Sequence, residues 1–446
     1  MSSATRSRRR SRRQDPSRGG GPAAPHPVAP PPGGGGQRRA PTPVTPRLRS
    51  RGGGLGAVRV RQLVLVEIAL ALVLVGLAVH MLLAVAMAVV AVLLLVAALG
   101  RWRRVPLPDW FATVRAMKRR KAAIVPVPPG VESAFAPVVE CDPSLRTYEY
   151  MDREQRAVGF VGDGTFLTAL VQVEAPDEPL RPVRDSRPVP LHLLHSALQI
   201  EDIRLESAQF VQYSQPAPAP HLPPQAVAAV SYGPLQARTG TPAVQMTWIA
   251  LKLDPELCPE AVEARGGGLG GAQRSLLRAA DQLVSRLSGY GLEARVLEER
   301  EVVAALGVAV CASPRANVAA GRDNQSRRRT EETARAWRCD DRWHSSYWVR
   351  SWPQLGSGAT PLADLVRLLS GGRAMASVFS LTADHGTHSA RALTGHVRLC
   401  ARSDNELAAA QQELEQRARS AKAGLVRLDR EQLPGLLATL PLGGTR

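Results

Sequence analysis

The longest feature of the hydrophobic pattern is an almost unbroken apolar run from Leu63 to Gly100. Over these 38 residues, only Glu67 and His80 carry ionisable side chains. A single helix of that length would measure about 57 Å, whereas the hydrocarbon core of a bilayer is about 30 Å thick. Divided near His80, the run gives two segments that are each close to the length needed to span a bilayer. The pattern therefore predicts a two-helix transmembrane hairpin over residues 57–101.

Basic residues at both ends of the run predict how this hairpin is oriented. Because the cytoplasmic ends of membrane helices are enriched in Lys and Arg, we expect both ends, and both chain termini, in the cytoplasm. Of the two polar groups inside the run, Glu67 is expected to pair helices or reach the interface, and His80 to mark the turn. The membrane-flanking basic residues are Arg59, Arg61, Arg101, Arg103 and Arg104.

The segments on either side of the hairpin are polar and basic. Residues 1–56 combine Arg clusters with Pro and Gly tracts and contain almost nothing large enough to bury, which predicts a disordered tail. This tail is either simply solvated or grips lipid headgroups or an acidic partner. Residues 102–130 form a basic juxtamembrane helix and a Pro-rich linker, and the helix lies on the membrane surface or extends the second span.

Beyond residue 130 the order of apolar runs repeats. Residues 131–312 and 344–446 are each predicted to follow the order βαββαβ plus a final helix, and a polar linker at 313–343 joins them. In the first unit we expect strands at 158–173 (with a turn at 162–164), 203–213, 243–253 and 292–297, and helices at 190–199, 272–288 and 299–306. In the second unit we expect strands at 345–352, 374–381, 391–401 and 425–428, and helices at 361–370, 404–421 and 430–439.

This order is that of a ferredoxin-like fold. The predicted fold class is therefore a membrane-anchored α+β protein. A two-helix transmembrane hairpin precedes a cytoplasmic α/β domain, which consists of two tandem ferredoxin-like (βαββαβ) units.

The distribution of charge excludes a simple nucleic-acid-binding role. The net charge is +18, but residues 1–51 carry +11 of it and residues 101–121 carry +7, so residues 122–446 are nearly neutral. Charge placed beside the apolar run favours anionic lipids at the cytoplasmic leaflet. We expect anionic lipids to bind through the basic flanks, and we expect no nucleic acid partner. The five cysteines never form a CxxC pair, which predicts free thiols in a reducing compartment.

The sequence contains no strong catalytic, cofactor or metal motif, and we predict none of these sites. The phosphate-binding pattern GxxxxGK[ST] does not occur. The weak candidate for an anion-binding loop is Gly266, Gly267, Gly268, Gly270 and Gly271, directly before a predicted helix. Two groups contain residue types that bind metals: His192 with His195, and Cys339 with Asp340, Asp341 and His344. Both lack the remaining ligands that zinc spacing requires.

Several stretches of the chain resemble one protein family. They include RVRQLVLVEIALALVL at the start of the apolar run, VGFVGDGTFLTALVQV, LKLDPELCPEAVEARGGGLGGAQRSLLRAADQLVSRL, RRTEETARAWRCDDRWHSSYWV and the terminal LVRLDREQLPGLLATLPLGG. Together they resemble EccE, the membrane component of the actinobacterial type VII (ESX) secretion system. The resemblance runs from about residue 57 to the C-terminus and does not include the Arg-rich tail.

The resemblance implies a function in protein transport at the bacterial plasma membrane. It implies a non-catalytic structural subunit of the translocon, in complex with EccB, EccC and EccD, where EccC supplies the ATPase. The alternative is a membrane-anchored enzyme or ligand-binding domain that uses the Gly266–Gly271 loop for a phosphorylated ligand. A third hypothesis is a binder of nucleic acid or anionic lipid that acts through the tail.

Overall fold

The computed structural model describes residues 60–79, 81–99, 101–102, 105–123, 125–176, 189–216, 222–223, 225–239, 244–322, 328–354, 361–385 and 392–444. The predicted disordered tail lies outside the described residues. So do His80 and three of the predicted flanking residues, Arg59, Arg103 and Arg104.

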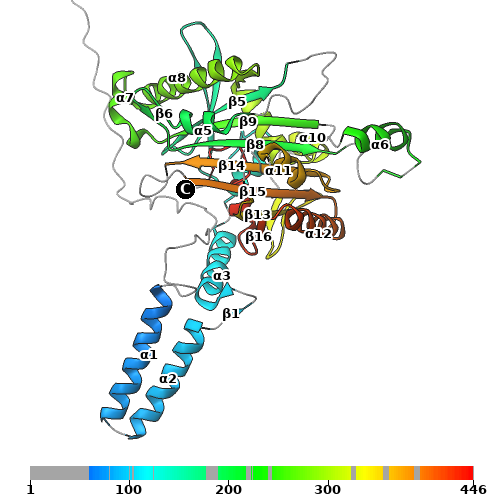
Figure 1. Cartoon of the computed structure of the whole chain (residues 1–446). Coiled ribbons are helices and arrows are strands. Elements are labelled where there is room, and N and C mark those ends of the chain that lie inside the picture. The colour runs from blue at the N-terminus through cyan, green and yellow to red at the C-terminus, as the bar shows by residue number, and fades with distance from the viewer. Residues whose placement is uncertain are drawn as a thin grey trace, which may run out of the picture. The chain divides into compact units, whose positions relative to one another are not determined.

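One large antiparallel sheet forms the centre of the described fold (Figure 1). Its first six strands along the chain are β3 (Arg146–Met151), β4 (Ala157–Gly162), β5 (Leu167–Glu174), β8 (Ser207–Gln215), β9 (Val244–Leu253) and β10 (Glu293–Val296). The other six are β11 (Thr330–Glu332), β12 (Trp337–Cys339), β13 (Arg342–Ser351), β14 (Ala376–Asp384), β15 (Ala392–Ala401) and β16 (Gly424–Arg427). The 12 described strands are ordered β11-β12-β13-β15-β14-β8-β9-β5-β4-β3, with β10 beside β5 and β16 beside β13.

The two halves of the chain meet at the pairing of β8 with β14. This pairing is continuous from Ser207 opposite Asp384 to Ser214 opposite Ser377. The strand order β10-β5-β9-β8 of the first half recurs in the second half as β16-β13-β15-β14. Because an unpaired edge strand exposes a row of backbone hydrogen-bonding groups, joining β8 to β14 satisfies both edges at once.

The predicted fold class is wrong. Instead of two tandem ferredoxin-like units behind a membrane hairpin, the chain forms a single 12-stranded antiparallel sheet with helices, because β8 and β14 pair across the predicted boundary. The predicted transmembrane hairpin is not evident either. Among the helices whose residues the structure describes, none is long and apolar enough to cross a membrane.

Helices cover one face of the sheet in two groups. Over the first half lie α5 (Leu191–Ala197), α7 (Pro259–Ala264) and α8 (Gly268–Gly289), and over the second half lie α11 (Leu362–Ser370) and α12 (Asp404–Ser420). The helix expected at 272–288 is confirmed as α8, whose apolar stripe buries Leu276, Leu283 and Leu287 against the sheet. The spacing of these residues places them on one side of the helix.

Three further helices cover the opposite face. They are α4 (Ala136–Cys141), α9 (Glu299–Ala309) and α13 (Gln432–Leu437). Successive side chains of a strand point to opposite faces, so Leu170 of β5 joins this core while Ala169 and Val171 join the core under α8. The result is a sheet that is buried between two layers of helices.

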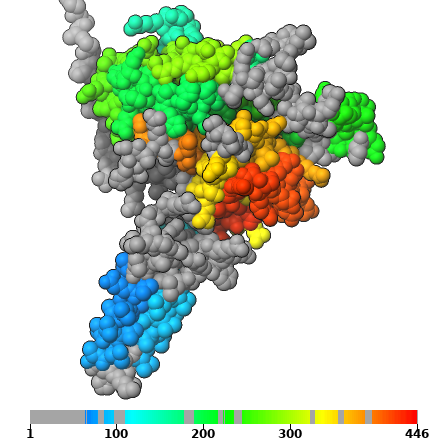
Figure 2. All heavy atoms as spheres, in the orientation of Figure 1, coloured from blue at the N-terminus to red at the C-terminus, as the bar shows by residue number. Residues whose placement is uncertain are grey.

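The remaining described elements are neither strands of the large sheet nor the helices named above. The helices are α1 (Val60–Val79), α2 (Met81–Leu99), α3 (Leu107–Ala122), α6 (Val227–Thr239) and α10 (Pro314–Arg322), with a short 3-10 turn, η1 (Pro255–Leu257). The strands form two short pairs, β1 (Arg101–Trp102) with β2 (Val105–Pro106) and β6 (Gln199–Ile200) with β7 (Ile203–Arg204). Helices α1 and α2 lie side by side (Figure 2), and each buries one alanine, Ala69 and Ala91.

Candidate functional site

The residues predicted to flank the apolar run are only partly described. Arg61 lies in the first turns of α1, and Arg101 begins β1. Glu67 lies on α1 with its side chain exposed. The roles of these positions remain predictions.

The glycine-rich loop at 266–271 joins α7 to α8 where the two helices pack closely together. Gly266, Gly267 and Gly268 have φ values of 98°, 65° and 55°, which glycine adopts without steric cost. A Cβ on Gly267 would lie 2.9 Å from a carboxylate oxygen of Glu263, and one on Gly271 would collide with the carbonyl oxygen of Val262. Backbone conformation at Gly266–Gly268 and the packing of α7 against α8 at Gly271 therefore account for these four glycines without a ligand.

A side chain also lies over this loop. The Nε of Arg274 donates to the carbonyl of Arg265 at 2.6 Å, and its Nη2 would lie only 2.5 Å from a Cβ on Gly266. This arginine satisfies a backbone acceptor beside the start of α8. Anion binding by the loop stays a prediction.

Helix α3 is fastened to the second half of the sheet by one buried carboxylate. Glu332 of β11 accepts hydrogen bonds from Arg120 Nε at 3.1 Å and Nη2 at 2.9 Å, and from the backbone N–H of Leu433 at 3.1 Å. The Glu332 side chain is only 5% exposed. At the other end of α3, the guanidinium of Arg430 lies over the ring of Trp110 at 5.1 Å. These contacts fix α3 against β11 and α13.

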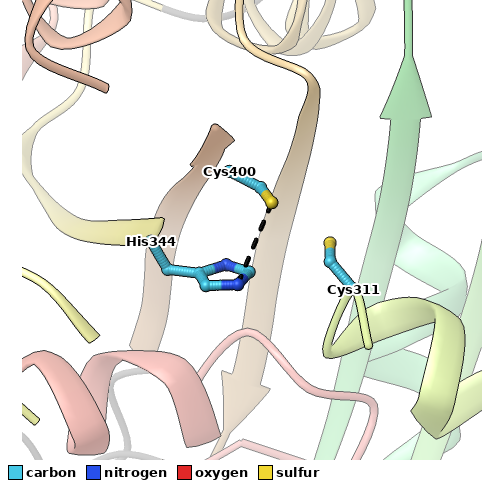
Figure 3. A group of neighbouring side chains, drawn as sticks. All are labelled: Cys311, His344 and Cys400. Atoms are coloured by element: carbon cyan, nitrogen blue, oxygen red, sulfur yellow. Dashed lines mark hydrogen bonds between the residues drawn. The ribbon is translucent and has the colours of Figure 1, made fainter. Parts of the chain in front are cut away.

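The most unusual group of side chains lies inside the fold, between the sheet and α9. Cys311 follows α9, His344 lies on β13, and Cys400 lies opposite His344 on the neighbouring strand β15 (Figure 3). All three are buried, and their possible ligand atoms lie within 4.8 Å of one another. We refer to these three residues as the thiol–imidazole cluster.

Arg398 sets the direction of the hydrogen bonds in this cluster. It is 1% exposed, and its Nη1 lies 3.0 Å from Nδ1 of His344 and 4.0 Å from Sγ of Cys311. Since a guanidinium can only donate, Nδ1 of His344 must accept, and the imidazole proton is therefore on Nε2. Nε2 lies 3.9 Å from Sγ of Cys400, so that sulfur is the acceptor of this weak bond.

The other groups of Arg398 bind the ends of two helical segments. Its Nε donates to Oγ1 of Thr439 at 2.7 Å, and its Nη2 donates to the carbonyl of Ala309 in the last turn of α9. A cation at a helix C-terminus is favoured by the helix dipole. Arg398 thus holds β15, α9 and the segment after α13 together.

Burial and charge shift the pKa values within the cluster in opposite directions. A hydrogen bond from the Cys400 thiol, with Arg398 and Arg342 nearby, lowers the pKa of Cys311 to about 6. The same hydrogen bond, together with burial, raises the pKa of Cys400. Burial and then Arg398 lower the pKa of His344 well below its ordinary value, so the imidazole is neutral. The arrangement favours one thiolate, one thiol and one neutral imidazole.

Two sulfurs and an imidazole are ligands that zinc and copper(I) prefer. The surroundings of this cluster, however, do not suit a cation. The one lone pair of the neutral His344 ring is already directed at Arg398, and the nitrogen that faces Cys400 carries a proton. Arg398 and Arg342 also place two positive charges beside the sulfurs. Metal binding would have to displace the Arg398 hydrogen bond.

The sequence alone does not bring these residues together. Spacing along the chain groups His344 only with its neighbours Cys339, Asp340 and Asp341. Its real partners come from β15 and from the end of α9, and the register that sets His344 opposite Cys400 depends on the whole sheet. Only the alternation of residues along the two predicted strands indicates that His344 and Cys400 face the interior.

Part of the chain matches the model of a known protein family. Residues 241–349 match the family model described as "Putative type VII ESX secretion system translocon, EccE". This stretch runs from the start of β9 through α8 and α9 to β13, and includes both Cys311 and His344. No curated protein matches the chain.

Proposed function

We propose that the chain is an EccE-family component of a type VII (ESX) secretion translocon and acts there as a non-catalytic structural subunit. The family match is the observation that carries this proposal. In this proposal the sheet domain contacts the other subunits, of the EccB, EccC and EccD types, at the plasma membrane.

Two features of the chain support a role without catalysis. The sequence contains no GxxxxGK[ST] motif, which fits a subunit that leaves ATP hydrolysis to another component of the complex. The glycine-rich loop is explained by the packing of α7 on α8 and by Arg274, which occupies the space in front of Gly266. The alternative of a phosphate-binding enzyme gains no support from these contacts.

Exposed apolar surface supports assembly with partners. Many large apolar side chains on the described parts of α1 and α2 are exposed, with exposed fractions between 45% and 68%. Contiguous apolar surface of this kind is typical of sites that contact other proteins or membranes. We infer that these two helices contact the other subunits. The exposed residues include Val64, Leu70, Leu74, Leu77, Val85, Val92 and Leu93.

The exposed basic side of α3 supports contact with anionic lipid headgroups. Arg115, Lys118, Arg119 and Lys121 are exposed, whereas Arg120 between them is bound to Glu332. Each basic residue near an anionic surface contributes about 1 kcal/mol to attraction. We propose that these four residues bind anionic lipid beside the translocon.

Co-purification tests the proposed function. The full chain should carry an affinity tag at its N-terminus, because the C-terminal segment as far as Gly444 packs against the sheet. After mild detergent extraction, EccB-, EccC- and EccD-type subunits should co-purify with it in reproducible proportions. Recovery of the tagged chain without any of these subunits would contradict the proposal.

Vesicle binding tests the lipid contact separately. Alanine at Arg115, Lys118, Arg119 and Lys121 should reduce binding of the purified chain to vesicles containing phosphatidylglycerol, but not to neutral phosphatidylcholine vesicles. The matched control replaces four exposed arginines elsewhere, Arg300, Arg350, Arg402 and Arg419. Equal losses in both variants would show that only net charge matters and would contradict a site on α3.

A further inference from the structure

The thiol–imidazole cluster has no part in the structural role proposed above. We propose that Cys311 and Cys400 form a redox-active dithiol, in which Cys311 is the thiolate and Cys400 the thiol, and that a small peroxide converts them into a disulfide. Their sulfur atoms are within 4.8 Å of each other and are enclosed by β13, β15 and the end of α9 (Figure 3).

The order of donors and acceptors makes the two cysteines unequal. Arg398 donates to Nδ1 of His344, and Nε2 of that ring then donates to Cys400. The Sγ of Cys400 lies within 4.8 Å of the Sγ of Cys311, so the S–H proton of Cys400 can be directed at that sulfur. Cys311 also faces Nη1 of Arg398 at 4.0 Å, and its own donor contact is a long one of 3.9 Å to the carbonyl of Ala309, which already accepts from Nη2 of Arg398. A sulfur in that position is stabilised as a thiolate.

The charges around the cluster lead to the same assignment. Arg398 is buried, and the partners of its guanidinium are the imidazole of His344, the hydroxyl of Thr439, the carbonyl of Ala309 and the sulfur of Cys311. Among these partners, only Cys311 can carry a full negative charge. A buried charge without an opposite charge is strongly unfavourable, so ionised Cys311 balances Arg398.

The backbone at Cys311 supplies an independent observation. The N–H of Ala312 donates to the carbonyl of Gly307 at 3.1 Å, and the N–H of Cys311 donates to that of Val308 at 2.9 Å. This is the Schellman pattern at a helix C-terminus, and its left-handed position is usually glycine. Cys311 occupies that position with a φ of 55°. A side chain kept in a conformation that favours glycine is a feature of functional sites.

The proposed reaction needs a small oxidant, because Cys311 and Cys400 are 3% and 1% exposed. The Cys311 thiolate attacks one oxygen of hydrogen peroxide; the O–O bond breaks, an S–O bond forms, and hydroxide leaves. Cys400 then attacks the sulfur of the resulting sulfenic acid; the S–O bond breaks, and the departing hydroxide takes the Cys400 proton and leaves as water. Two thiol sulfurs are oxidised by two electrons in total, and one peroxide is reduced.

Peroxide treatment of the purified full chain tests this proposal. After treatment with hydrogen peroxide and alkylation, mass spectrometry under non-reducing conditions should find a peptide pair linked through Cys311 and Cys400, which dithiothreitol releases. Cys141 and Cys339 serve as internal controls, because burial raises the pKa of both thiols. Since thiolates are the reactive form, Cys311 should react at least about tenfold faster than either control.

Variants separate the roles of the two sulfurs. With Cys400→Ser, dimedone should trap a sulfenic acid on Cys311. With Cys311→Gly, which suits the left-handed backbone, Cys400 should stay reduced. Cys141→Ser is the matched control and should leave the linked pair unchanged. The proposal is overturned if peroxide oxidises the controls as fast as Cys311, or if no Cys311–Cys400 link forms. It is also overturned if the untreated protein holds one zinc or copper ion that Cys311→Gly removes.

Discussion

Single buried charges hold the separate parts of this chain together. Glu332 joins α3, β11 and α13 through three hydrogen bonds, and Arg398 joins β15, α9 and Thr439. Removing one member of a buried ion pair leaves the other without compensation, which costs more than the pair contributes. We therefore expect large effects from a few residues that look ordinary in a sequence rich in arginine.

Arg120→Ala tests the attachment of α3. Glu332 would keep only the N–H of Leu433, so we expect the variant to lose about 3 kcal/mol of unfolding free energy. Denaturant unfolding followed by circular dichroism measures this loss. Arg119→Ala is the matched control, because Arg119 is exposed on the next position of the same helix, and its effect should stay within about 0.5 kcal/mol. Equal effects of the two changes would contradict the assigned ion pair.

His396 should make stability depend on pH. Burial lowers the pKa of this histidine from 6.5 to about 4. As pH falls from 6.5 to 4, the unfolded chain binds a proton at His396 that the folded chain does not bind. The free energy of unfolding therefore falls by up to about 3 kcal/mol. The contribution is fully present above pH 6.5 and is lost as pH falls through 4.

His396→Leu isolates this contribution. Neither ring nitrogen of His396 has a hydrogen-bond partner among the described residues, so leucine should be tolerated at pH 8. The difference in unfolding free energy between the variant and the original chain should grow as pH falls from 6.5 to 4. A difference that stays constant over this range would show that His396 does not titrate as expected.

Elements with a strong local pattern were predictable, and elements held by distant contacts were not. The apolar stripe placed α8, and the pattern at 404–421 placed α12, observed at Asp404–Ser420. By contrast, the predicted linker 313–343 contains α10, β11 and β12. The polar sequence of this stretch does not show the alternation that predicts a strand. It is held in place by a distant residue, because the buried carboxylate of Glu140 accepts hydrogen bonds from the N–H groups of Arg329 and Thr330.

The start of α8 depends on close contact with α7. Gly271→Ala would push a Cβ into the carbonyl oxygen of Val262, and we expect a loss of about 1–3 kcal/mol in unfolding free energy. Gly289→Ala at the other end of α8 meets nothing within 4 Å and should be neutral or stabilise by up to about 1 kcal/mol. Thermal unfolding of both variants checks the contrast. No loss at Gly271 would contradict the packing explanation of the glycine-rich loop.

At the scale of the whole molecule, the decisive contacts connect the two halves of the chain. The repeated strand order could be anticipated from the repeated pattern, but the pairing of β8 with β14 could not. The alternation of apolar and polar residues predicts a strand, but it does not predict which other strand pairs with its free edge. The thiol–imidazole cluster shares this limit, because its residues come from both sides of the predicted boundary.

The C-terminal segment also ties the halves together. The backbone N–H groups of Gly443 and Gly444 donate to Oε1 of Gln209 at 2.9 Å, and Oγ1 of Thr168 donates to the carbonyl of Leu442 at 3.0 Å. A chain that ends at Ala438 loses these bonds and leaves Oε1 of Gln209 and Oγ1 of Thr168 buried without them, so it should unfold at markedly lower denaturant concentration. Removing only residues 445–446 is the control and should have little effect. Equal midpoints for the two truncated chains would contradict this role.

We propose that this chain works as a subunit of a type VII secretion translocon. The native mass of the particle that contains the full-length chain, measured after mild detergent extraction of the cells that produce it, tests this role. The chain should migrate in one large complex together with EccB-, EccC- and EccD-type subunits. Migration of the chain as a lone monomer, while those subunits remain assembled without it, would contradict this role.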